Sequence, residues 1–150
     1  MDLYHRPQNL FAAEFIGSPK MNVLPGKLLR AEADHAVVEV HGEQVKAAVD
    51  ARGAQAGAPV SIGIRPEHLE HGDTGEGSKL HVKLRQMERL GDESLLYLEI
   101  TPDVPTVTLR VEGHAPNSEG ETVTLRIRPE QCHLFDAAGK SFKRTVQLPA

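Results

Sequence analysis

The chain has 150 residues, of which 17 are Lys or Arg and 21 are Asp or Glu, and its formal net charge is −4. This balance argues against sequence-independent nucleic-acid binding and against a polybasic membrane anchor. Cys132 is the single cysteine, which excludes an intramolecular disulfide and a cysteine-based zinc site and indicates a reducing, cytosolic setting. No apolar run approaches the roughly 20 residues that cross a bilayer, and the first residues do not read as a secretory signal.

The N-terminal residues 2–16 are expected to form a helix. Pro7 suits a first helical position, where its missing N–H would have no partner in any case. Phe11 and Phe15 follow at helical spacing, and the Gly-Ser-Pro sequence at 17–19 ends the helix.

From Met21 onward the pattern changes to short apolar stretches rich in β-branched residues. Polar residues and glycines separate these stretches as in a β-meander, which continues to about Val49. About eight short strands with regular turn signals predict a mainly β fold, either a small barrel or a sandwich. After the meander, strands are expected at 60–64, 81–90, 95–100, 107–111 and 122–127, loops at 51–59 and 71–77, and fraying from Ser141.

An internal repeat links two of these strands. Residues 60–67 recur at residues 123–130, and both segments end in Ile-Arg-Pro-Glu. Proline cannot continue a central strand but starts a helical turn well, and the adjacent glutamate favours the N-terminus of that turn. The repeat predicts a strand-to-turn corner that is used twice. A functional Arg/Glu pair at each corner is the alternative.

Sequence motifs for phosphate or oligonucleotide binding are not found. The Gly-Lys at 26–27 and the Gly-Lys-Ser at 139–141 lack the glycine that a phosphate loop needs five residues earlier. Tyr97 is the single aromatic residue inside the strands expected after the meander, whereas oligonucleotide-binding barrels present several aromatics within a basic groove.

Metal-binding and nucleophilic residues are equally weak candidates. His68 and His71 lie near three carboxylates and would permit a metal site, but a solvated loop is the simpler interpretation. The side chains of Cys132 and His133 diverge in an extended segment, which argues against a nucleophile and its base. We therefore expect no catalytic, cofactor or metal site.

Three stretches carry a resemblance to a known family. They are residues 3–22 (LYHRPQNLFAAEFIGSPKMN), 63–69 (GIRPEHL) and 129–136 (PEQCHLFD), with an ERLGDE hairpin at 88–93. In this order they are similar to the C-terminal part of the ATP-binding subunits of bacterial carbohydrate ABC importers, of the maltose and glycerol-3-phosphate type. The resemblance covers essentially the whole chain.

The resemblance implies an oligomer-binding-like (OB-like) β-barrel of the transport-associated (TOBE) type over residues 21–150. Residues 1–20 would form a helical junction from a preceding nucleotide-binding domain, on which Phe11 and Phe15 pack. ATP and Mg²⁺ would belong to that domain, so neither a cofactor nor enzyme activity is expected in this chain.

The implied function is regulation and dimerisation of an importer ATPase. The implied partners are a second copy of the subunit, the nucleotide-binding domain, the membrane permease subunits and, in some members, a cytosolic regulatory protein, but no nucleic acid. The implied location is the cytoplasmic face of the inner membrane.

Regulatory or interface residues are expected at positions that match the family's motifs. Core packing is the competing interpretation for Phe135, and an exposed strand position is the competing interpretation for Glu88. The candidates are Glu88, Phe135, Arg65, Glu67, Arg128 and Glu130.

A different class of function is the main alternative. Related barrels in oxyanion importers bind molybdate or tungstate, so this chain could be a small-ligand-binding module. The lack of a concentrated Ser/Thr/Lys cluster at the corners makes the regulatory interpretation the stronger one.

Overall fold

The computed structural model describes residues 21–100, 106–113 and 118–145. The helix expected over residues 2–16, with Phe11 and Phe15, lies outside the described residues. Within them the expectation of a mainly β chain is confirmed, since two single-turn 3-10 helices are the sole helical elements there. No helix in this part of the chain is long and apolar enough to cross a membrane.

Twelve strands are present among the described residues, rather than about eight. In chain order the elements are β1 (Asn22–Ala31), β2 (Ala36–Val40), β3 (Glu43–Ala47), β4 (Val49–Asp50), β5 (Pro59–Ile64), η1 (Pro66–His68), β6 (Glu70–His71), β7 (Ser78–Arg89), β8 (Glu93–Glu99), β9 (Val107–Glu112), β10 (Thr122–Ile127), η2 (Pro129–Gln131), β11 (His133–Phe135) and β12 (Lys143–Arg144).

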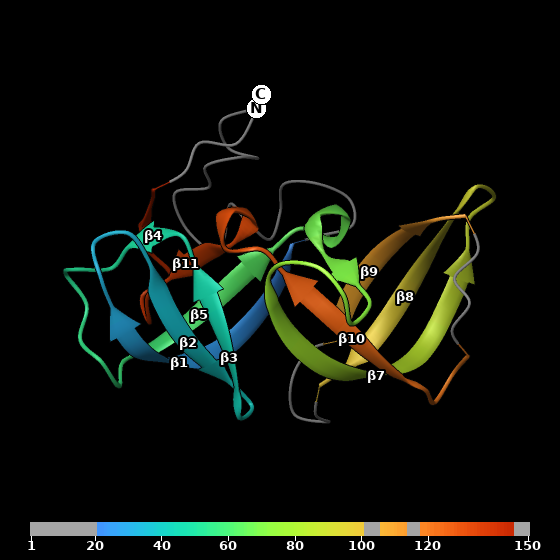
Figure 1. Ribbon diagram of the computed structural model, residues 1–150, viewed down its shortest axis with the longest axis horizontal. Helices are drawn as coiled ribbons and strands as arrows, with labels where there is room; N and C mark the ends of the chain where they lie inside the picture. The colour runs from blue at the N-terminus through green and yellow to red at the C-terminus, as the bar shows by residue number, and fades with distance from the viewer. Residues whose placement is uncertain (1–20, 101–105, 114–117, 146–150) are drawn as a thin grey trace.

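The strands form two lobes that lie side by side (Figure 1). The first lobe is a five-stranded sheet of order β11-β5-β1-β2-β3, and the second is a five-stranded sheet of order β6-β10-β7-β8-β9. A small third sheet pairs β12 with β4. All strand pairs are antiparallel, which allows each sheet to bury one face and leave the other in water.

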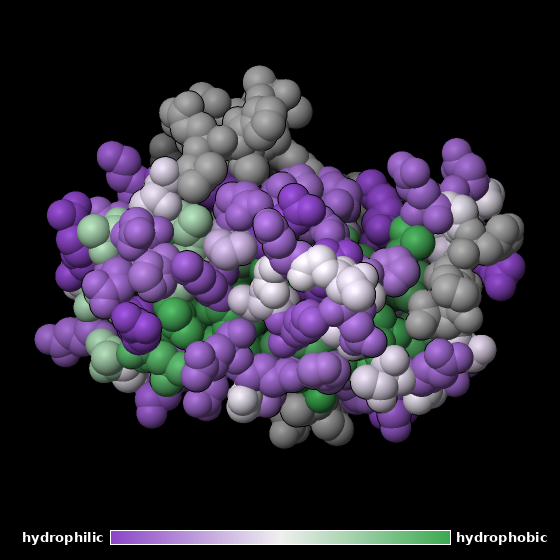
Figure 2. All heavy atoms as spheres, viewed as in Figure 1, coloured by the Kyte–Doolittle hydropathy of each residue, from purple (hydrophilic) through white to green (hydrophobic). Residues whose placement is uncertain are grey.

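The strand sequences explain how the sheets bury one face. In β2 the buried residues Ala36, Val38 and Val40 alternate with more exposed ones, and β10 alternates in the same way. Most side chains on the face shown in Figure 2 are hydrophilic, and hydrophobic ones appear mainly between them.

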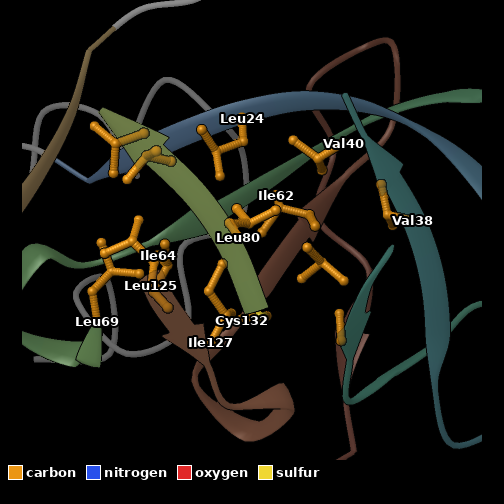
Figure 3. Packing of buried hydrophobic residues seen from close by; sticks show 14 of the residues in the cluster. Leu24, Val38, Val40, Ile62, Ile64, Leu69, Leu80, Leu125, Ile127 and Cys132 are labelled. Carbon is orange, nitrogen blue, oxygen red and sulfur yellow. The ribbon is translucent and has the colours of Figure 1, made fainter. Parts of the chain in front are cut away.

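One hydrophobic cluster runs through both lobes. In the close view, Leu80 and Leu125 of the second lobe lie near Ile62 and Ile64 of the first (Figure 3). The side chains are almost all aliphatic, as expected from the low aromatic content, and Phe135 is the single aromatic among the fully buried residues of the described chain. The lobes therefore share one interior.

The four shortest strands account for the difference in strand number. β4, β6, β11 and β12 have only two or three residues each, too few to show a periodic pattern in the sequence. Each becomes a strand because it meets a partner far away in the chain. The fraying expected from Ser141 is also wrong as far as Thr145, whose N–H donates to Ala48 O at 3.0 Å.

The two lobes match strand for strand. By position in the sheets, β1, β2, β3 and β5 correspond to β7, β8, β9 and β10. The fifth strand of each sheet comes from the other half of the chain. β6 follows η1 but pairs with β10, whereas β11 follows η2 but pairs with β5. The two halves thus exchange their last strands.

Candidate functional site

The two Ile-Arg-Pro-Glu corners lie where the halves of the chain cross between the lobes. At the first corner Arg65 is extended, with φ −69° and ψ 143°, and Pro66 opens η1. The His68 N–H donates to Arg65 O at 2.9 Å and closes the turn. This corner packs on β9 of the second lobe.

The second corner has the same geometry. Arg128 is extended, with φ −78° and ψ 134°, and Pro129 opens η2. The Gln131 N–H donates to Arg128 O at 3.0 Å. This corner packs on β3 of the first lobe, where the Ala48 N–H donates to Pro129 O at 3.0 Å. The strand-to-turn corner predicted from the sequence is therefore present twice.

The two corner arginines have different environments. Arg65 is 1% exposed and is the largest of the fully buried side chains. The Arg128 side chain is 43% exposed, and its Nε lies 2.9 Å from Glu70 Oε1. Glu70 also accepts a hydrogen bond from Arg126 Nη1 at 2.8 Å. One carboxylate on β6 is thus shared by two arginines of the other half of the chain.

The corner glutamates are not equivalent either. Glu67 is exposed on η1, whereas Glu130 is half-buried. The backbone carbonyl of Glu130 accepts a hydrogen bond from the Arg144 guanidinium, which ties η2 to the C-terminal strand β12. Sequence reasoning did not identify Arg126, Glu70 or Arg144 as parts of this arrangement, because no local pattern distinguishes them from ordinary charged strand residues.

Phe135 lies in the core rather than on a surface. It is fully buried and packs with Met21 at one end of the first lobe. Gly63 makes this packing possible, because a Cβ atom there would lie 2.9 Å from Phe135 Cε2 and 2.5 Å from Met21 Sδ. Any influence of Phe135 on a partner would therefore act through packing.

Glu88 lies exposed near the end of the β7–β8 hairpin, away from the corners. Its Oε1 accepts a hydrogen bond from the Tyr97 hydroxyl at 2.8 Å, across the two strands. That bond to a carboxylate raises the pKa of Tyr97, with burial and the negative charge adding to the effect. Glu88 is available to a partner at the cost of this one hydrogen bond.

The other chemical candidates have structural explanations. Cys132 is buried, and burial raises its thiol pKa to about 12, which removes it as a nucleophile at neutral pH. Its Sγ lies 3.5 Å from Arg128 O and 3.7 Å from Lys46 O. Within the described ranges, no group of three or more His, Cys, Asp or Glu side chains could hold a metal ion.

A pocket of about 440 Å³ opens at the far end of the first lobe, and no sequence signal pointed to it. The Asp136 carboxylate on its rim accepts hydrogen bonds from the N–H groups of Ala138 and Lys140, both at 2.9 Å, so it holds a turn. The lining residues are Gly53, Ala54, Gln55, Ala58, Pro59, Val60, Asp136, Ala137, Ala138 and Phe142.

These features define a two-lobed β module whose distinctive elements are the two interlocking corners. The family model described as "MalK OB fold domain" matches residues 17–69, and the model described as "TOBE domain" matches residues 62–135. The chain belongs to this MalK-type family of OB-fold and TOBE domains.

The same assignment follows from comparison with curated relatives. The chain is 37% identical over 150 residues to the maltose/maltodextrin import ATP-binding protein MalK of Salmonella typhi, and 36% identical over 152 residues to that of Escherichia coli K12. These alignments cover 99% of this chain but 40% and 41% of the relatives. The chain therefore spans about 40% of the length of these proteins.

A solved structure supports the fold. The cytoplasmic molybdate-binding protein ModG, with molybdate bound, superposes with a TM-score of 0.62 at 15% sequence identity. The match covers 75% of this chain and 94% of ModG. At this identity the likeness concerns the fold alone.

Proposed function

We propose that this chain is the regulatory and dimerisation part of the ATP-binding subunit of a sugar ABC importer. The observation that carries the proposal is the similarity to MalK along 99% of the chain, with the two family models in consecutive positions. The relatives are named for import of maltose and maltodextrin and for ATP binding, and the part of them beyond this chain is the larger one. ATP and Mg²⁺ would bind in that part.

The proposed role is mechanical rather than chemical. Residues 1–20 would connect the module to the nucleotide-binding domain, with Phe11 and Phe15 packed on it. Two modules would associate in a homodimer and hold the ATPase pair together while it opens and closes on the membrane permease subunits, at the cytoplasmic face. A cytosolic regulator that binds the module would then change the ATPase equilibrium by its preference for one state.

Surface exposure favours two of the candidate residues as contacts for such partners. Glu88 and Glu67 are exposed carboxylates on separate elements, the β7–β8 hairpin and η1. Arg128 and Glu130 are half-buried at the second corner, and Arg65 and Phe135 are buried. The buried pair would act by holding the shape of the surface.

A chimera tests the proposal directly. This chain would replace the matching C-terminal region of the E. coli maltose import ATP-binding protein, and maltose uptake and ATPase activity would be measured in a strain lacking the native subunit. We expect uptake to be restored, whereas the subunit truncated at the same junction is the matched control and should restore less. If the chimeric subunit is present at normal levels but performs no better than the truncated one, the proposal is wrong.

Oxyanion binding is the second candidate function, favoured by the fold shared with ModG. Calorimetric titration of the chain with molybdate, tungstate and maltose separates the two classes. Saturable micromolar binding of an oxyanion would favour the ligand-binding module, and the absence of heat with all three would favour the regulatory one.

A further inference from the structure

The pocket at the far end of the first lobe lies between two segments that are distant in the chain. One wall is the loop between β4 and β5 together with the start of β5, and the other is the turn between β11 and β12. The loop lies at the end of the first lobe that faces away from the second lobe (Figure 1). The pocket volume of about 440 Å³ is in the range of sites that hold small molecules.

Backbone hydrogen bonds hold the loop wall in place. The Gly57 N–H donates to Leu28 O at 2.7 Å, and the Leu28 N–H donates to Ala58 O at 2.9 Å, so the loop is tied to β1. The Ala54 N–H donates to Ala51 O at 3.0 Å. This wall is formed before any ligand arrives, and binding therefore carries little cost in ordering it.

The turn wall is held in the same manner. The Asp136 N–H donates to Lys140 O at 2.9 Å, and the Gly139 N–H donates to Asp136 O at 2.9 Å. The Phe142 N–H donates to Leu134 O at 2.8 Å and ties the end of the turn to β11. Both walls of the pocket are thus fixed by hydrogen bonds of the main chain.

Most of the pocket lining is apolar. Ala54 and Phe142 line the pocket and also pack, partly buried, against the main hydrophobic cluster. Alanine, proline and valine side chains supply most of the remaining lining. An apolar group of a ligand would lose contact with water on this lining, which favours its binding.

Asp136 is the single charged residue that lines the pocket. Its Oδ1 accepts the N–H groups of both Ala138 and Lys140. Within the part of the chain that the structure describes, neither a hydrogen bond nor an ion pair reaches its Oδ2. A cationic group can therefore bind Oδ2 without breaking the bonds that hold the turn.

We propose that this pocket binds a protonated amine with a compact apolar body. The ammonium group donates to Asp136 Oδ2 in a charge-assisted hydrogen bond, and the apolar body lies against Ala54 and Phe142. The face of the Phe142 ring attracts the same positive charge. An anion of equal size is repelled by Asp136, and a neutral analogue loses the charge-assisted bond. This inference goes beyond the proposed function and does not rest on a role in transport.

Titration with phenethylamine tests the proposal, followed in the backbone amide NMR spectrum of the whole chain. We expect saturable binding with a dissociation constant on the order of 1 mM, because the ligand is small and the pocket is open to water. The amide signals that move should be those of the two walls, such as Gly53, Ala54, Ala137 and Ala138. Phenethyl alcohol and phenylacetate have the same apolar body, and both should bind at least about fivefold more weakly.

Asp136→Asn removes the charge and leaves the turn intact, because the amide oxygen accepts the same two N–H groups as Oδ1. We expect this variant to bind phenethylamine about fivefold more weakly and phenethyl alcohol as the wild-type chain does. Asp73→Asn is the matched control, since it makes the same change of net charge in the exposed loop 72–77. It should leave the binding of both compounds unchanged.

Three results would overturn the proposal. The first is no saturation by phenethylamine, or shifts that lie outside the two walls. The second is equal affinity for the amine and the alcohol. The third is a folded Asp136→Asn variant that binds the amine as tightly as Asp73→Asn does.

Discussion

The side chain of Asn22 pairs with the backbone of Thr108 as a neighbouring strand would. Its Nδ2 donates to Thr108 O at 2.7 Å, and the Thr108 N–H donates to its Oδ1 at 2.7 Å. Asn22 is 7% exposed, so these bonds form away from water. An amide side chain thereby satisfies a peptide group on the edge strand β9 and joins it to β1 of the other lobe.

Replacing Asn22 by Ala should destabilise the fold by about 2–3 kcal/mol, because the N–H and the carbonyl oxygen of Thr108 both lose their hydrogen-bond partner. Asn22→Asp keeps the acceptor but places a carboxylate against the Thr108 carbonyl. We expect Asn22→Asp to be least stable at neutral pH and to gain stability relative to wild type as the pH falls and the carboxyl is protonated. Thermal unfolding between pH 4 and pH 8 would show whether Asn22→Asp differs in this way from Asn22→Ala.

Gly63 should not tolerate a side chain. Gly63→Ala puts a methyl group 2.5 Å from Met21 Sδ and 2.9 Å from Phe135 Cε2, and the cost of such overpacking is about 1–3 kcal/mol. Gly53→Ala is the matched control, since a Cβ atom there meets nothing within 4 Å. Urea unfolding of the two variants measures the difference, and equal midpoints would refute the explanation.

Glu70 should stabilise the crossing of β6 into the second lobe. In Glu70→Gln the charge shared by Arg126 and Arg128 is lost, and we expect a loss of about 1 kcal/mol that becomes smaller at high salt. Glu76→Gln, in the exposed loop that follows, is the control and should be neutral within about 0.5 kcal/mol. A salt-independent loss, or no loss, would show that the ion pairs contribute nothing.

Cys132 should be unreactive in the folded chain. Burial raises its thiol pKa to about 12, well above the ordinary range of a cysteine, so alkylation by iodoacetamide at pH 8 should require unfolding. The folded state also keeps this proton when the unfolded chain has lost it. Stability should therefore fall as the pH rises above about 9, and this part of the fall should disappear in Cys132→Ala. Rapid labelling under native conditions would contradict the assignment.

The long strands after the meander and the two corners could be predicted from the amino-acid sequence alone. Five of the expected strands lie where β5, β7, β8, β9 and β10 are found, because alternation of apolar and polar residues is a local property of a half-buried strand. The Ile-Arg-Pro-Glu turns are equally local, since in both copies the proline directly follows the strand and opens a 3-10 turn.

Tertiary structure alone decided which segments pair and which environment each corner has. Two short segments become strands because each pairs with a strand from the other half of the chain: Glu70–His71 pairs with β10, and His133–Phe135 pairs with β5. The same reason places Arg65 in the interior and leaves Arg128 half exposed beside Glu70, although both stand in the same four-residue sequence. Burial and charge pairing depend on neighbours that are distant in the chain. The local alternation of apolar and polar residues contains no information about those neighbours.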